Sequence, residues 1–95
     1  MSRFEWDPIK NQQLQRDRGV SFEEVEAAIR EGRVLNHAPH RNQERYPGQF
    51  ILIVEINHYA YEVPYVRSGE VFFFKTIFPS RKATRDYLRP QESSE

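Results

Sequence analysis

The chain has 95 residues, of which 38% are hydrophobic and 29% are charged, a composition typical of a soluble globular domain and not of a disordered chain. Fourteen basic residues balance fourteen acidic ones, so no overall charge attracts the protein to nucleic acid or anionic lipid, and any nucleic-acid site must be a local patch. The absence of cysteine excludes disulfides, thiol nucleophiles and thiolate metal sites.

The length predicts one small domain with a single core. No apolar run approaches the roughly 18 residues that a membrane span needs, and the first ten residues lack the apolar segment of a signal peptide. We therefore expect a cytoplasmic protein that does not bind membranes. Its domain should span residues 1–88, followed by a polar, disordered tail over residues 89–95.

A short extended segment at the N-terminus is followed by the signals of a first helix. Asp7 is a predicted N-cap and Pro8 fits the first helical turn, so the helix should continue to about Asp17. Ile9 and Leu14 are its only large aliphatic residues. They predict a surface helix with a narrow buried stripe.

A second helix begins at the capping box of Ser21 and Glu24, after Gly19 has ended the first. Gly32 closes this second helix. Its apolar residues recur at helical spacing and predict one buried face. These residues are Phe22, Val25, Ala28 and Ile29.

The second half of the chain predicts strands. Asn57 and His58 fit a tight hairpin turn, and Pro64 predicts a bulge or an unpaired stretch in its strand. The predicted fold is α+β: two N-terminal helices packed on a twisted antiparallel sheet of about four strands, with a short C-terminal helix. Both sheet faces are partly apolar, so the face away from the N-terminal helices needs the C-terminal helix or a partner protein. The strands are predicted at residues 33–38, 50–56, 59–66 and 71–78.

The last strand runs directly into a basic helix start. Pro79 ends the strand, Ser80 is a predicted N-cap, and Arg81 and Lys82 occupy the first helical turn. Cations are unfavourable there because the helix dipole prefers anions, and a bound phosphate would explain them. The alternative is that both side chains are simply solvated.

A polar loop over residues 39–48 holds a second set of reactive side chains. Together with Arg81 and Lys82 they supply cations that can bind phosphate, imidazoles that can exchange protons and phenols that can stack on bases. Metal-independent cleavage of RNA requires groups of these kinds. A metal site made by His37, His40 and Glu44 is a less favoured alternative, because the spacing is not diagnostic. The loop region contributes His37, His40, Arg41, Glu44, Arg45 and Tyr46.

Three motifs occur together in the chain: FEWD at residues 4–7 with Lys10, GVSFEE at residues 19–24, and SRKAT at residues 80–84 with Tyr87. In this order they resemble the BrnT family of bacterial toxins. The resemblance implies a RelE-like fold and a ribonuclease, the toxin component of a type II toxin-antitoxin module, that inhibits translation by cutting RNA. It also implies a cognate antitoxin similar to BrnA, which has a ribbon-helix-helix domain. The toxin would contact operator DNA only through this antitoxin.

From the residues and the resemblance together we predict the site. Arg45, Arg81 and Lys82 match functional positions of the family, and an ungapped alignment places Thr76 where the family has an arginine. Adjacent residues of a strand face opposite sides of the sheet, so Lys75 replaces that arginine only if a bulge or register shift turns the Lys75 side chain to the other side. The predicted catalytic residues are Arg81, Arg45, Lys82, Tyr87 and His40. The predicted substrate-binding residues are Lys75, Arg41, Tyr46 and Ser80, with no metal and no cofactor.

Two other functions fit the same sequence. One is a non-enzymatic or inactive toxin-like module that binds an antitoxin-like DNA-binding partner through a sheet face. The other is a structural domain with no role toward nucleic acid. Loss of RNA cleavage in Arg81→Ala favours the nuclease, whereas loss of partner binding in Ile53→Asp favours the interaction module.

Overall fold

The structure is a computed structural model that describes residues 3–89, so the predicted tail lies outside the described residues except for Arg89. The fold is α+β, as predicted. Its helices are α1 (Pro8–Arg18), α2 (Phe22–Arg30) and the short α3 (Arg81–Ala83), which continues as a π-helical turn, η1 (Thr84–Leu88). Its strands are β1 (Arg3–Glu5), β2 (Val34–Pro39), β3 (Gln49–Ile56), β4 (Tyr59–Ser68), β5 (Val71–Phe74) and β6 (Phe78–Pro79).

The sheet differs from the predicted antiparallel sheet of about four strands. It has six strands in the order β1-β5-β4-β3-β2, with β6 pairing with β4 beyond the end of β5. β1 runs parallel to β5, which makes the sheet mixed. The predicted strand over residues 71–78 is divided into β5 and β6, and the extended N-terminal segment joins the sheet as an edge strand.

The division between β5 and β6 is a register shift opposite Pro64. Tyr65 pairs with Phe74 and Glu62 pairs with Phe78, so residues 75–77 of this segment face only two residues of β4. The expected irregularity therefore falls in the neighbouring strand, whereas β4 itself is continuous. Pro64 has no N–H to offer, and its carbonyl accepts from the Lys75 N–H at 2.8 Å.

The α1 helix begins as predicted but buries a different residue. The Asp7 carboxylate accepts from the Ile9 N–H at 2.9 Å, which caps the helix. Ile9 itself is 66% exposed, so the prediction that it lies in the buried stripe was wrong. Asn11 is buried in its place because its amide has two partners: it donates to Glu23 at 2.7 Å and accepts from the Phe22 N–H at 2.7 Å.

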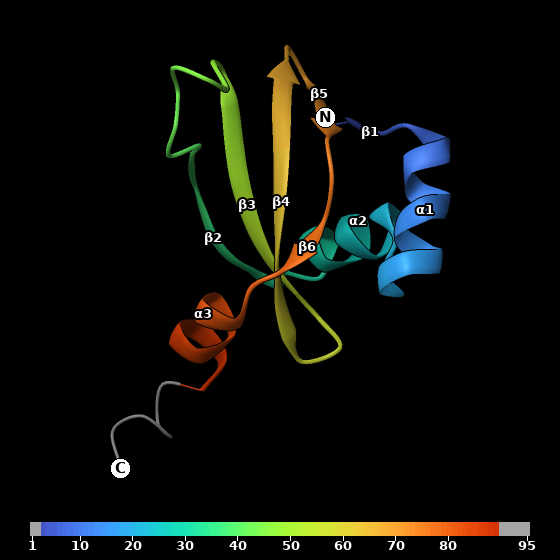
Figure 1. The fold of residues 1–95 in the computed structure, drawn as a ribbon, viewed down its shortest axis with the longest axis vertical. Coiled ribbons are helices and arrows are strands. Elements are labelled where there is room, and N and C mark those ends of the chain that lie inside the picture. Colours follow the sequence, from blue (N-terminus) through green and yellow to red (C-terminus); the bar gives the residue numbers. More distant parts are fainter. Residues whose placement is uncertain (1–2, 90–95) are drawn as a thin grey trace.

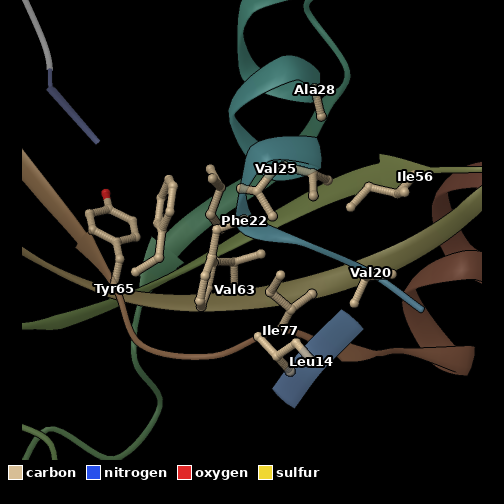
Figure 2. Packing of buried hydrophobic residues seen from close by; sticks show 12 residues of the cluster. Leu14, Val20, Phe22, Val25, Ala28, Ile56, Val63, Tyr65 and Ile77 are labelled. Carbon is tan, nitrogen blue, oxygen red and sulfur yellow. The ribbon is translucent and has the colours of Figure 1, made fainter. Parts of the chain in front are cut away.

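The α2 helix carries the predicted apolar face. The capping box of Ser21 and Glu24 is formed, and Phe22, Val25 and Ala28 are fully buried. In Figure 2 these three side chains point from the helix onto the strands, where they meet Val63, Ile77 and other residues of the core. Phe22 and Phe74 are among the largest fully buried side chains of the cluster.

Alternation along the strands gives the sheet two faces. The first face is the one covered by α1 and α2, whereas α3 lies on the other side of the strands, at the lower left of Figure 1. The first face carries Leu52, Val54, Ile56, Val63, Tyr65, Phe74 and Ile77. The second face carries Asn36, Ala38, Ile51, Ile53, Glu55, Ala60, Glu62, Pro64 and Phe73.

The C-terminal segment covers one end of the second face. Ala60 exchanges two hydrogen bonds with it: its carbonyl accepts from the Ser80 N–H at 2.9 Å, and its N–H donates to the Thr84 hydroxyl at 2.9 Å. This end adjoins the predicted hairpin turn, where Asn57 and His58 have φ of 54° and 65°. The C-terminal helix thus supplies part of the cover that the second face was predicted to need.

Candidate functional site

Three side chains form a row across the middle of the second face. Asn36 of β2 pairs with Ile53 of β3, and Ile53 pairs with Glu62 of β4. Neighbouring strands are about 4.8 Å apart, so the backbones of Asn36 and Glu62 are separated by about 10 Å. Arg41 reaches the Glu62 end of this row, and Tyr87 reaches the Asn36 end.

Glu62 is the carboxylate of this row, and it is 9% exposed. One of its oxygens, Oε1, is buried and accepts no hydrogen bond from any of residues 3–89. The nearest cation is the Arg41 guanidinium, whose Nη2 lies 3.7 Å from this oxygen while the Arg41 side chain is 80% exposed. An unmatched buried acceptor costs about 1–3 kcal/mol, and such groups in native proteins are often associated with function.

Tyr87 reaches the other end of the row. Its hydroxyl oxygen accepts a hydrogen bond of 2.6 Å from the side-chain amide of Asn36. Because the phenol is the acceptor in this bond, its own proton can be donated to another group. Tyr87 is 41% exposed, so the side chain is not enclosed by the fold.

The C-terminal segment places its residues on two sides. The inward side packs on the sheet and is fixed by Thr84, which is 3% exposed and whose hydroxyl donates to the Ser80 carbonyl at 2.8 Å. The spacing i, i+3, i+4, i+7 groups the inward residues. These are Ser80, Ala83, Thr84 and Tyr87, and the outward residues are Arg81, Lys82, Arg85 and Asp86.

The outward side carries the predicted phosphate-binding cations. Lys82 pairs with Asp86 at 2.8 Å, and this hydrogen bond is the main cause of the lowered pKa of the Asp86 carboxyl. Arg81 forms no ion pair with any residue of the described chain, 3–89. Ser80 acts as the predicted cap, since its hydroxyl accepts from the Ala83 N–H at 3.0 Å. Arg81 and Lys82 therefore point away from the row of Asn36, Ile53 and Glu62.

The polar loop packs two tilted rings and a guanidinium together at the end of the strands opposite the C-terminal segment, and we call this group the His40, Arg45 and Tyr46 stack. The His40 and Tyr46 ring centroids are 4.5 Å apart, and the Arg45 guanidinium lies 5.5 Å from the Tyr46 centroid. The His40 Nδ1 accepts from the Asn42 N–H at 3.0 Å, which places the proton of the neutral ring on Nε2. The stack is partly exposed, as a surface for a planar ligand requires.

Lys75 lies on the second face. Its ammonium is 5.6 Å from the ring centroid of Phe73, a residue of that face. The register shift between β5 and β6 begins after Phe74, but Lys75 keeps the face that simple alternation gives it, beside Phe73. The replacement of the family's arginine by Lys75 therefore stays a prediction.

The alternative metal site does not form. His37 lies on the first face, where its Nε2 is hydrogen-bonded to the Tyr65 hydroxyl, and His40 lies on the loop. Among residues 3–89 no three His, Asp or Glu side chains are grouped closely enough to hold a metal ion.

The nine predicted site residues thus fall into separate groups. The structure brings Arg41 and Tyr87 to the same row, whereas the His40, Arg45 and Tyr46 stack and the Ser80 turn lie toward opposite ends of the strands. Two members of the row were not predicted, Asn36 and Glu62. The available signal for Glu62 was its position as the only charged residue in an otherwise uncharged strand sequence, YAYEVPYV, because a carboxylate buried in a sheet normally needs a partner.

Comparison of the sequence with protein-family models and with curated proteins gives no match. Within residues 3–89, none of the helices is long and apolar enough to cross a membrane.

Proposed function

We propose that the second face binds single-stranded RNA and cleaves it without a metal, as the toxin component of a type II toxin-antitoxin module. The observation that carries this proposal is Glu62, a buried carboxylate with an unmatched oxygen, opposite the Arg41 guanidinium and in the same row as the Tyr87 contact. A base, a cation and an acid in one row are the groups that RNA cleavage needs.

Each group has one role in the reaction. Glu62 takes the proton of the ribose 2′-hydroxyl, and the 2′-oxygen then attacks the adjacent phosphorus. Arg41 stabilises the additional negative charge on the phosphate oxygens. Tyr87 donates its proton to the departing 5′-oxygen, so the products are a 2′,3′-cyclic phosphate and a 5′-hydroxyl. Water returns the proton from Glu62 to Tyr87 after product release.

The other predicted residues bind the RNA strand in this proposal. The paired rings of His40 and Tyr46, with the Arg45 guanidinium beside them, offer a surface on which a flanking base stacks. Lys75 contributes positive charge on the same face, and Ser80, Arg81 and Lys82 add charge and a hydroxyl at the edge. The attraction between these cations and the RNA phosphates weakens as the salt concentration rises.

The resemblance to BrnT toxins supports the same function, a RelE-like arrangement of the α+β fold, and a BrnA-like ribbon-helix-helix antitoxin as partner. A second candidate is a non-enzymatic module that binds such a partner through the second face. It is favoured by the half-buried apolar side chains of Ile53, Val66 and Phe73 on that face, which a partner would cover.

The test is RNA cleavage by the wild type and by variants of the row, with growth and total RNA integrity followed after expression in a bacterial host. Glu62→Gln should lower the cleavage rate by about 10²–10⁴-fold. Arg41→Ala and Tyr87→Phe should also lower it. Glu55→Gln is the matched control, because Glu55 lies on the same face and its carboxylate pairs with His58 at 3.5 Å.

Arg81→Ala distinguishes catalysis by the row of the second face from catalysis by Arg81 at the start of the C-terminal helix. In the proposal it weakens RNA binding and leaves the maximal rate nearly unchanged, whereas a catalytic Arg81 would abolish cleavage. A wild type that is expressed and folded but neither arrests growth nor cuts RNA would contradict the nuclease proposal and support the interaction module. Ile53→Asp should then break the partner complex while Glu62→Gln does not.

A further inference from the structure

A second candidate site lies on the first face, away from Glu62. The α1 and α2 helices leave part of this face open, and a cavity of about 250 Å³ is found there between α2 and the strands. Its wall is almost entirely apolar. It is lined by Phe4, Ile29, Val34, His37, Leu52, Tyr65 and Phe72.

The polar atoms of the wall are paired with each other. The His37 Nε2 and the Tyr65 hydroxyl share a hydrogen bond, and the two rings stack with centroids 5.6 Å apart. The Tyr65 ring in turn lies 5.1 Å from Phe72, which lies 5.8 Å from Phe4. The cavity therefore presents ring faces and aliphatic groups to a guest, and it favours an apolar group.

The rim of the cavity is positively charged. The Arg67 guanidinium lies 5.2 Å from the Phe72 ring centroid, and the Arg30 guanidinium lies 6.0 Å from that of Phe4. Arg30 is already paired with Glu26 at 2.5 Å. The Arg67 Nε donates only to the Gly69 carbonyl, at 3.0 Å, and Arg67 makes no ion pair with a carboxylate among residues 3–89. Arg67 thus offers a cation to an acidic group placed over the cavity.

We propose that this cavity is a docking site for an amphipathic segment of a partner protein, which inserts one large apolar side chain and pairs an acidic residue with Arg67. The size supports a side chain, because about 250 Å³ is below the roughly 300–1,000 Å³ of small-molecule sites and suits a single aromatic or aliphatic anchor. The charge supports an acidic neighbour. The inference goes beyond the proposed nuclease and does not depend on it, since none of the lining residues belongs to the second face.

The experiment is a selection from a displayed library of 12-residue peptides on the full-length protein, with counter-selection against Val34→Trp. Val34 is 38% exposed and lines the cavity, so the larger ring fills the cavity without replacing a fully buried side chain. Enriched peptides should share one Trp, Phe or Leu and an Asp or Glu within one helical turn. Val34→Trp should weaken their binding at least about tenfold, and Arg67→Glu about fivefold.

Two variants on α1 are the matched controls. Ile9→Trp adds the same ring at a position that is 66% exposed, and Arg16→Glu makes the same charge reversal on an exposed arginine. Neither should change peptide binding. RNA cleavage by Val34→Trp and Arg67→Glu, measured in parallel, should match the wild type, so failure of the docking proposal is distinguishable from failure of the nuclease proposal.

Three outcomes overturn the docking proposal. The first is enrichment of peptides that lack the apolar and acidic pair. The second is peptide binding that Val34→Trp and Arg67→Glu leave unchanged, with folding of both variants confirmed by amide NMR spectra. The third is displacement of the selected peptides by indole-3-acetate at an equal concentration, which would make the cavity a small-molecule site.

Discussion

Phe73 and Phe74 are neighbours in β5, but their side chains lie on opposite faces of the sheet. Phe74 on the first face is 1% exposed, and its ring stacks on those of Phe4 and Phe22 at 5.4 and 5.9 Å. Phe73 on the second face is half-buried, and its ring contacts the Lys75 ammonium. Phe74 therefore lies in the packed core under the helices, whereas Phe73 lies beside a cation on a less covered part of the sheet.

The buried polar groups of the two faces differ in the same way. Between α1 and α2, which cover the first face, the Asn11 amide both donates and accepts a hydrogen bond. On the second face the Glu62 Oε1 has no hydrogen-bond donor within the described chain. Matched groups stabilise a fold, and an unmatched group lowers its stability unless a ligand binds it. The comparison indicates that the helix-covered core of the first face, apart from its open cavity, provides stability, and that the row on the second face is available to a ligand.

The largest expected effect tests the packing of the first face. Phe74→Ala should lower the free energy of unfolding by about 3–5 kcal/mol, because the ring is replaced by a cavity. Phe73→Ala, at the next position but on the second face, should cost clearly less. Urea unfolding followed by circular dichroism measures both. Equal losses for the two variants would contradict the assignment of stability to the first face.

The next effect concerns the buried hydroxyl that fixes the C-terminal segment to the second face. Thr84→Val keeps the shape of the side chain but leaves the buried Ala60 N–H without its acceptor. The free energy of unfolding should therefore fall by about 1–3 kcal/mol. Thr84→Ser retains the hydroxyl and should retain most of the stability. If the valine variant unfolds like the wild type, the hydrogen bond does not fix this segment.

A smaller effect of opposite sign is expected at Glu62. Glu62→Leu removes the unmatched carboxylate and should raise the free energy of unfolding by about 1 kcal/mol while RNA cleavage is lost. Unfolding curves and cleavage rates from the same preparation measure the two changes. A destabilised leucine variant would mean that the Arg41 pair outweighs the cost of burying the carboxylate, and that the second face is optimised for stability after all.

The smallest effect appears only at alkaline pH. Burial raises the pKa of Tyr65 above its ordinary value of 10.0, against a lesser lowering by Arg67, and burial also raises the pKa of Tyr61. Both phenols keep their protons in the folded state after the unfolded chain has lost them. Their contribution is therefore complete below about pH 10 and is lost as the pH rises toward the raised values. Tyr65→Phe should flatten, without abolishing, the fall in urea midpoint above pH 10; an unchanged fall would exclude Tyr65 as a cause.

The elements that were predicted correctly depend on nearby residues. The caps at Asp7 and Ser21 and the Asn57 turn need side chains within a few positions of one another, and the structure contains all three. The burial of Ile9 was predicted from its residue type and was wrong. Asn11 takes the inward position on α1 because its amide forms two hydrogen bonds with residues of α2. The parallel pairing of β1 joins opposite ends of the chain, and no local pattern encodes it.

The candidate site also combines features set by nearby residues with features set by residues far apart in the chain. The sequence by itself determined the residue types, the helix caps and the alternation that puts Ile53 and Glu62 on one face. Only the tertiary structure decided that Arg41 and Tyr87 converge on this row while Arg81 and Lys82 point outward. The physical reason is that strand register and the docking of the C-terminal segment are set by contacts between residues far apart in the chain, such as the Asn36 to Tyr87 hydrogen bond across 51 positions.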